Sequence, residues 1–233
     1  AACLAIRGKK VLILDIDPQG NTTSGIGVRK RNLKDTIYNI LVDKDYDPRK
    51  AIIKTSVNNL DLIPASVDLA GAEVELVSVD GRENALKEGL DKIKGGYDYV
   101  FIDCPPSLGL LTINSLAAVD SVLVPIQCEF YALEGVSQLV STIELVKKSL
   151  NPKLEIQGVI LSMFDGRTNL SLQVVQEVKR YFGNKVYSTV IPRNVRLAEA
   201  PSYGMPITEY DPKSKGAEAY GDFADEFLEL EED

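Results

Sequence analysis

The sequence has no histidine and only three cysteines. The absence of histidine excludes catalysis by a histidine base. Cys3, Cys104 and Cys128 show no paired spacing, so we do not expect a zinc site of the cysteine and histidine kind. No apolar run reaches the roughly 20 residues that a membrane-spanning helix needs, and the first residues lack the basic-then-apolar order of a signal peptide. We therefore expect a cytoplasmic protein in a reducing compartment.

Positive charge is absent from residues 216–233, which contain eight acids and no lysine or arginine. The rest of the chain carries 26 acids and 26 bases, so the net charge of −8 resides in this segment. Residues 179–215 are locally positive, with seven bases and three acids. The overall charge is therefore a poor guide to whether this surface meets nucleic acid.

Apolar, β-branched runs predict strands over residues 11–14, 60–63, 99–102, 122–126, 156–161 and 186–191. Several of these runs are continuous rather than alternating, which is typical of parallel strands buried on both faces. Helical periodicity between them predicts helices near 67–78, 83–93, 108–118, 133–150 and 170–182. The alternation predicts a single α/β domain over residues 1–233, doubly wound, with a mostly parallel sheet and helices on both faces.

Both ends of the sequence have helical patterns. Residues 1–7 are typical of the last turns of a helix that ends at Gly8. This segment has no helix start, so we expect the sequence to be an N-terminally truncated part of a longer chain. The spacing of Tyr220, Phe223, Phe227 and Leu230 predicts a final amphipathic helix that packs on the sheet.

Two acidic segments follow predicted strands, at the sheet edge where ligands of such folds bind. In the first, Asp15 and Asp17 are two residues apart, so their carboxylates can face one side of an extended segment. In the second, residues 99–102 lead into Asp103, the general shape of a Walker B strand whose carboxylate engages Mg²⁺. Each pattern alone has a simpler explanation, because Asp17 before Pro18 can cap a turn and strands that end in aspartate are common.

Five segments in combination resemble the ParA-type (Soj-like) DNA-partitioning ATPases, in that family's order and across nearly the whole chain. The segment 11–21 is similar to the A′ motif of this deviant Walker family, and 99–107 is similar to its Walker B motif and the switch that follows; the other three are 124–135, 190–202 and 210–220. The resemblance implies a P-loop NTPase-like fold and an ATPase of chromosome or plasmid partitioning that requires ATP and Mg²⁺.

The resemblance also implies roles for single residues. Asp17 matches the aspartate that positions the water attacking the γ-phosphate, Asp103 matches the aspartate that holds Mg²⁺ through water, and Asp15 supports the same edge of the nucleotide site. The loops that approach the nucleotide base in this family correspond to those of Met163, Asp165, Pro192 and Asn194. Core packing or turn formation explains Met163 and Pro192 equally well.

In this family the ATP-bound homodimer binds double-stranded DNA without sequence preference, and a ParB-like partner stimulates hydrolysis. The resemblance therefore implies a nucleoid-associated protein, and the acidic polar face of the last predicted helix disfavours membrane binding. Contacts of basic side chains with phosphate suit such binding, since they carry no base information. The matching basic residues are Arg193, Arg196, Lys213 and Lys215, of which Arg196 lies in the better-matched segment.

One departure from the family concerns the phosphate-binding loop. A KGGVGKT-type run is absent from the 233 residues, and with it the first strand and the loop that wraps the phosphates. We expect this polypeptide alone to be inactive and the longer parent to bind ATP. Two alternatives stay open: a MinD-like division-site ATPase, whose membrane helix normally carries bases that are absent here, and a nucleotide-free short form that acts as an interaction module.

Overall fold

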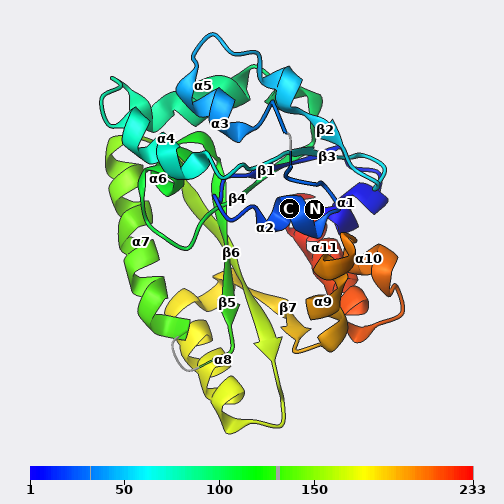
Figure 1. Ribbon diagram of the computed structural model, residues 1–233. Coiled ribbons are helices and arrows are strands. Elements are labelled where there is room, and N and C mark those ends of the chain that lie inside the picture. Colours follow the sequence, from blue (N-terminus) through cyan, green and yellow to red (C-terminus); the bar gives the residue numbers. More distant parts are fainter. Residues whose placement is uncertain (32, 130–131, 233) are drawn as a thin grey trace. The chain divides into compact units, whose positions relative to one another are not determined.

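The computed structural model describes residues 1–31, 33–129 and 132–232, which fall into two compact units (Figure 1). Unit 1 comprises Ala1–Val119 and Ala200–Pro206, and unit 2 comprises Asp120–Glu199 and the chain from Ile207 onward. The single domain over residues 1–233 stays a prediction. Residues 130 and 131 of the segment 124–135 lie outside the described residues. Within the described ranges we find no helix with the length and hydropathy of a membrane span.

Unit 1 contains a four-stranded sheet in the order β2-β3-β1-β4. Its strands are β1 (Val11–Asp15), β2 (Ile53–Lys54), β3 (Leu60–Ile63) and β4 (Tyr99–Asp103). β1 is parallel to both of its neighbours, and β2 runs antiparallel to β3. Every residue of β1 is buried, as its continuous apolar run predicts. The predicted parallel strands of this unit are confirmed, whereas β2 has only two residues and was not predicted.

Helices cover both faces of this sheet, with α3 and α5 on one side and α1 on the other (Figure 1). Leu12 and Leu14 of β1 point into the core formed with α3, α4, α5 and α6. The predicted end of the first helix is confirmed, because Gly8 follows it with a φ of 85°. The helical segments of unit 1 are α1 (Ala2–Ile6), α2 (Asn21–Gly25), α3 (Ile37–Val42), η1 (Pro48–Ala51), α4 (Leu69–Leu76), η2 (Arg82–Asn84), α5 (Ala85–Asp91), η3 (Lys94–Gly96), α6 (Leu110–Ala118) and η5 (Ala200–Tyr203).

Unit 2 contains a three-stranded parallel sheet in the order β5-β6-β7. Its strands are β5 (Ser121–Gln127), β6 (Glu155–Phe164) and β7 (Val186–Pro192). Val174 and Val178 of α8 pack with Val124 and Val159 of the sheet in one buried cluster. The helical segments are α7 (Ala132–Ser149), α8 (Asn169–Phe182), η4 (Gly183–Lys185), α9 (Val195–Glu199), α10 (Ile207–Tyr210) and α11 (Lys215–Glu232).

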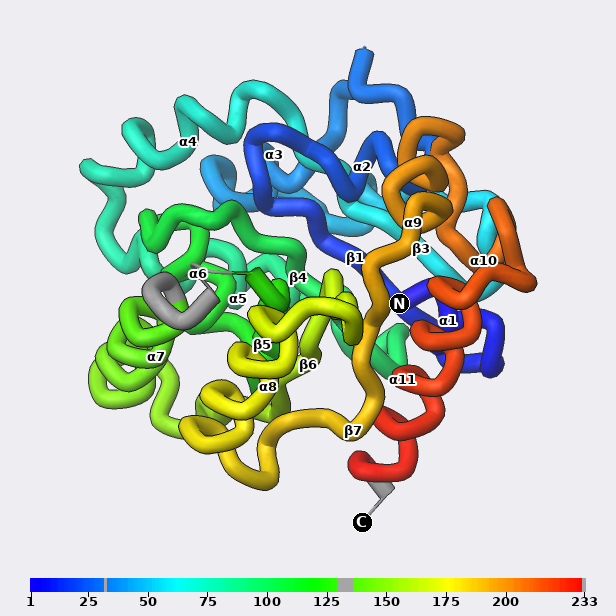
Figure 2. The backbone as a smooth tube through the Cα atoms, turned by 90° about the horizontal axis from the view of Figure 1, so that it is seen from below, coloured from blue at the N-terminus to red at the C-terminus, as the bar shows by residue number. Residues whose placement is uncertain are grey.

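The last helix, α11, packs along β7 (Figure 2). Phe223 lies edge-on against Tyr187 of β7, with ring centroids 4.9 Å apart, and Phe227 is buried. Tyr220 and Leu230 are 37% and 59% exposed, so the predicted apolar stripe is right in its middle and wrong at both ends. The carboxylate of Glu226 accepts hydrogen bonds from the amides of Ser188 and Thr189 at 2.6 and 2.8 Å. An acid of this helix therefore satisfies backbone donors of the edge strand, which would otherwise lack partners.

Two glycines allow the segment 200–206 to approach the turn after α2. A Cβ built on Gly204 would lie 2.7 Å from the Cα of Gly27, and one built on Gly27 would lie 2.8 Å from the carbonyl oxygen of Gly204. Both residues also have positive φ, 88° at Gly27 and 66° at Gly204. Only glycine meets both conditions without strain, so this contact fixes the position of the segment that follows β1.

A buried carboxylate closes the carboxyl end of β1. The Asp15 side chain is fully buried, and its Oδ2 accepts hydrogen bonds from the Thr23 amide at 2.7 Å and the Thr23 hydroxyl at 2.6 Å. Its Oδ1 accepts a hydrogen bond from the Asp17 amide at 3.2 Å. The Thr23 hydroxyl in turn accepts from the Ala65 amide at 3.0 Å. Burial raises the pKa of Asp15 above 3.8, and the bonds from Thr23 oppose that rise.

We predict that Thr23→Val destabilises the protein by about 2 kcal/mol near pH 7, because a buried carboxylate and a buried amide each lose a partner. The variant raises the pKa of Asp15 further. Burial already disfavours the ionised form in the fold, so the deficit relative to the parent grows as pH rises through the raised pKa of Asp15 and is smaller at lower pH. Urea unfolding at several pH values measures this, with Thr23→Ser as the control that keeps the hydroxyl. A deficit independent of pH would show that Asp15 does not depend on Thr23.

Candidate functional site

The register of unit 1 brings the predicted acidic residues to one edge of the sheet. Asp15 of β1 pairs directly with Asp103 of β4, at the carboxyl ends of two adjacent parallel strands. The Ile16 amide donates to the Asp103 carbonyl at 3.0 Å, which extends the pairing by one residue toward Asp17. Asp103 is exposed and Asp17 is half-buried. The edge therefore carries one enclosed carboxylate and two that solvent reaches.

The carboxylate of Asp103 is held on one side only. The Thr22 hydroxyl donates to its Oδ2 at 2.7 Å, while its Oδ1 accepts no hydrogen bond from the described part of the chain. Residues 1–31, 33–129 and 132–232 contain no group of three or more side chains that could cage a metal. Magnesium in phosphate-transfer sites is typically bound by one or two carboxylates together with phosphate and water. The Asp103 carboxylate and the Thr22 hydroxyl fit an ion of that kind.

Asp17 lies in the turn that leads to α2. Its Oδ1 accepts a hydrogen bond from the Gln19 amide at 2.9 Å, and its carbonyl accepts one from the Gly20 amide at 2.8 Å. Gly20 has a φ of 61° and is the N-cap of α2. Asp17 therefore closes a turn, as the simpler interpretation of the sequence predicts. The turn uses only one of its two carboxylate oxygens. Within the described ranges Oδ2 accepts no hydrogen bond, so it can orient a water molecule.

Three further side chains shape this edge and were not predicted as site residues. Thr22 and Thr23 bind the two strand-end carboxylates, and the Lys30 ammonium donates to the Gln19 carbonyl at 2.5 Å. Thr22 and Thr23 could have been found from the sequence, because two adjacent hydroxyl residues follow Gly20 closely. A run of bases at 29–31 and 34 was the signal for Lys30.

The residues matched to the nucleotide-base loops lie together in unit 2. Met163 is next to last in β6 and Pro192 is last in β7, and the two strand ends are joined by the Arg193 amide, which donates to the Phe164 carbonyl at 2.9 Å. Asp165 follows β6 and Asn194 follows β7. Met163 has a φ of 52°, a region that a residue with a side chain seldom occupies.

Both polar members of this set also stabilise local structure. The Arg167 guanidinium donates to both carboxylate oxygens of Asp165, at 2.9 and 2.7 Å, and lowers the pKa of Asp165 to about 2. Asn194 Oδ1 accepts a hydrogen bond from the Arg196 amide at 2.8 Å, at the start of α9. Contact of these four residues with a nucleotide base stays a prediction.

The four predicted DNA-contacting residues belong to unit 2, and their environments differ. Arg193 is paired with Glu129 at 2.5 Å. Arg196 is paired with Glu199 at 2.9 Å and with Asp211 at 3.4 Å, and the Tyr210 hydroxyl shares the Glu199 carboxylate. Lys213 and Lys215 are exposed, and no acid of the described chain pairs with them. The lysines present free charge, whereas each arginine must exchange a carboxylate for a phosphate.

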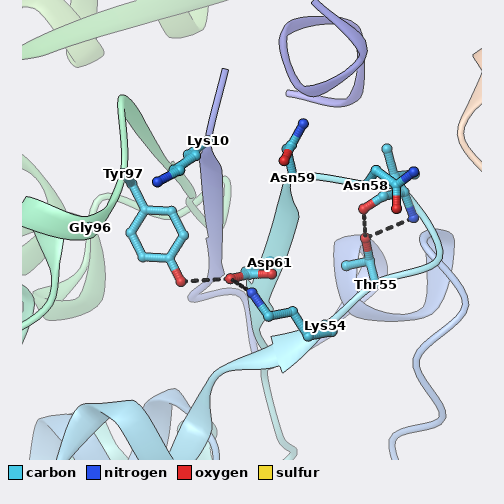
Figure 3. A pocket seen from close by; sticks show the side chains of 9 residues that line it. Lys10, Lys54, Thr55, Asn58, Asn59, Asp61, Gly96 and Tyr97 are labelled. Carbon is cyan, nitrogen blue, oxygen red and sulfur yellow. Dashed lines mark hydrogen bonds and ion pairs between the residues drawn. The ribbon is translucent and has the colours of Figure 1, made fainter. Parts of the chain in front are cut away.

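A cavity of unit 1 lies at the opposite end of its sheet (Figure 3). It has a volume of about 450 Å³ and is lined by residues that precede strands, such as Lys10, Asn59 and Tyr97, and by the end of the antiparallel strand β2. The buried carboxylate of Asp61 accepts from the Tyr97 hydroxyl at 2.8 Å and pairs with Lys54 at 2.7 Å. Asp15 and Asp103 lie at the carboxyl ends of their strands, so this cavity is not the site that they form.

The comparisons with known proteins agree on one family. A family model described as an AAA domain matches residues 1–156. The sporulation initiation inhibitor protein Soj of Bacillus subtilis is 61% identical over 97% of this chain and 88% of its own length. The chromosome partitioning protein ParA of Myxococcus xanthus is 53% identical over 94% of this chain and 77% of its own length.

Solved structures show the same fold. A structure titled cobyrinic acid a,c-diamide synthase from Mycobacterium smegmatis, with bound ADP and magnesium, aligns at a TM-score of 0.83 and 40% identity, covering 96% of this chain and 83% of that one. The cell division ATPase MinD of Pyrococcus furiosus aligns at a TM-score of 0.78 and 26% identity, covering 98% and 90%. The chain has the α/β fold of P-loop NTPases, as predicted, and it belongs to the ParA/Soj family of chromosome-partitioning ATPases.

Proposed function

We propose that the protein carrying this chain hydrolyses ATP at the carboxyl edge of β1 and β4 and uses the cycle to partition DNA. The pairing of Asp15 with Asp103, with Asp17 two residues beyond, is the observation that carries the proposal. It places three carboxylates where ligands of open α/β sheets bind. The relatives named as partitioning proteins and the neighbour with bound ADP and magnesium support the same choice of ligand.

The three carboxylates have different roles in the proposed reaction. The exposed Asp103 carboxylate, oriented by Thr22, holds Mg²⁺ through its water shell. Asp17 orients the attacking water through Oδ2, while Oδ1 keeps the turn closed. Asp15 supports both positions from within the fold. The metal, when bound, neutralises charge on the phosphate oxygens.

The second half of the proposal concerns unit 2. Met163, Asp165, Pro192 and Asn194 lie at the carboxyl ends of β6 and β7 and are the proposed contacts of the nucleotide base. The ATP-bound homodimer binds double-stranded DNA through Arg193, Arg196, Lys213 and Lys215, and a ParB-like partner stimulates hydrolysis. Exposed ion pairs such as those of Arg196 contribute little to stability, so a phosphate can replace the carboxylates there.

Asp17→Asn separates the two roles of this side chain. The amide oxygen still accepts from the Gln19 amide, so the turn persists, but the charge that orients water is lost. We predict that kcat for ATP hydrolysis falls about 100-fold or more, while nucleotide affinity changes less than about threefold. The assay uses the protein at its full natural length. A kcat equal to that of the parent would leave Asp17 as a turn residue only.

Charge reversal tests the DNA surface. We predict that Arg196→Glu abolishes DNA binding by the ATP-bound protein without changing ATP affinity, because the variant places an acid beside Glu199 and Asp211. Arg196→Ala should reduce the slope of log affinity against log salt by about one. Filter binding at several salt concentrations measures the loss of DNA binding and the change in the salt slope.

Arg180→Glu is the matched control, since Arg180 is an exposed arginine on α8 with one distant acidic neighbour, Glu177 at 3.9 Å. This variant has the same change of charge and should bind DNA as the parent does. DNA retention by Arg196→Glu, or an equal loss in both variants, would contradict the assignment.

A further inference from the structure

Helix α4 of unit 1 is apolar on two opposite sides. Leu69, Ala72 and Leu76 are buried against the core. Val67, Val74 and Val77 are 76%, 74% and 61% exposed, and Ala70 between them is exposed too. We call Val67, Ala70, Val74 and Val77 the outer stripe of α4. A continuous apolar stripe on a helix normally packs against another element.

The outer stripe has the spacing of a helix-packing seam. Its members are separated by three, four and three residues, which is the a and d pattern of a heptad. The helical turn begins before the formal start of α4, because the Ala70 amide donates to the Val67 carbonyl at 3.2 Å, and Val77 keeps helical backbone angles. In Figure 2, α4 lies at the outer margin of unit 1. The four side chains therefore form one continuous strip along an outer helix face.

Acids flank the stripe on both sides. At 100° per residue, Asp68 and Glu75 fall on one flank and Glu73 falls on the other, while Asp80 follows the end of the helix. Residues 65–80 contain no lysine or arginine. Glu73 is partly engaged, since its Oε1 accepts from the Leu111 amide at 3.4 Å at the start of α6. Among the described residues the Glu75 carboxylate has one donor, the neutral hydroxyl of Tyr38 at 2.9 Å, and no base pairs with it there.

Bases from elsewhere in unit 1 reach only the carboxyl end of the stripe. The Lys44 ammonium donates to the Asp80 carbonyl at 3.4 Å, and the Arg82 guanidinium donates to the Val77 carbonyl. The amino-terminal part, around Asp68 and Glu75, faces no base of the described chain in an ion pair. The uncompensated negative charge therefore lies beside Val67 and Val74.

We infer that the outer stripe of α4 binds an amphipathic, positively charged helix of a partner protein. Apolar residues of that helix cover the valines, and its lysines or arginines lie opposite the flanking acids, as e and g residues do in helix pairs. The same acids repel nucleic acid and anionic lipid. A second copy packed through the same stripe would set acid against acid across a two-fold axis, which disfavours self-association. This inference does not rest on ATP hydrolysis.

The test uses a synthetic 15-residue helix with leucine at a and d positions and lysine or arginine at e and g. Binding of the labelled peptide to the whole chain is followed by fluorescence anisotropy. We expect saturable binding that weakens with salt, and at least tenfold weaker binding both of a peptide with glutamate at e and g and of a scrambled peptide of the same composition. Equal binding of the ordered and scrambled peptides would reduce the effect to bulk charge and overturn the inference.

Variants locate the binding. Val74→Glu should weaken binding at least tenfold, and so should the double variant Asp68→Asn with Glu75→Gln, which keeps the volume and removes the charge. The matched control is Leu145→Glu on α7, since Leu145 is 66% exposed and also lies on a helix; its affinity should be unchanged. Circular dichroism confirms folding of each variant. Unchanged affinity in Val74→Glu and the double variant, or a dimer in light scattering that Val74→Glu dissociates, would contradict the inference, the latter by assigning the stripe to a second copy.

Discussion

The buried carboxylate of Asp15 is the constraint on which the candidate site depends. A charge without water is tolerated only when donors surround it, and here Thr23 supplies two donors and the Asp17 amide a third. These bonds hold the first turn of α2 and the Asp17 turn against the end of β1. Asp15 also pairs in register with Asp103 of β4. The exposed carboxylate of Asp103 therefore has a defined position relative to the Asp17 turn. Asp15 acts as a positioning residue, and the two acids that solvent reaches are left for ligands.

Acidic residues have different roles in different parts of the structure. At the strand ends it suits a magnesium nucleotide, and in unit 2 Glu199 and Asp211 hold the Arg196 guanidinium in a defined orientation. On α11, Glu226 satisfies the backbone donors of β7. These acids act locally within the fold, whereas those flanking the outer stripe of α4 stand at the surface beside exposed apolar residues.

The strands and the long helices could be predicted because their signals are continuous: a buried strand such as β1 has no polar residue before Asp15, and α8 repeats its apolar residues at helical spacing. A shared edge for Asp15, Asp17 and Asp103 could be predicted because both acidic segments directly follow predicted strands of a mostly parallel sheet. The partners of these acids could not be predicted, since Thr22 and Thr23 act through a turn whose geometry depends on Gly20 and on the contact of Gly27 with Gly204. Strand β2 and helix α2 were missed because two and five residues are too short for periodicity. Leu230 was misplaced because helical spacing does not tell where the sheet beneath a helix ends.

The most direct test of the account is to determine at which end of the unit 1 sheet a metal nucleotide binds. Asp98 and Asp103 stand at opposite ends of β4, roughly 16 Å apart for five residues of strand, and the Asp98 carboxylate is fixed by the Lys10 amide at 2.7 Å. Paramagnetic broadening by Mn²⁺–ADP, measured on aspartate labelled with ¹³C at the carboxyl carbon, separates the two positions. The account predicts that the Asp103 signal broadens at low Mn²⁺–ADP while the Asp98 signal stays sharp. A sharp Asp103 signal beside a broadened Asp98 signal would contradict it and place the nucleotide near the cavity of Lys10, Asp61 and Tyr97.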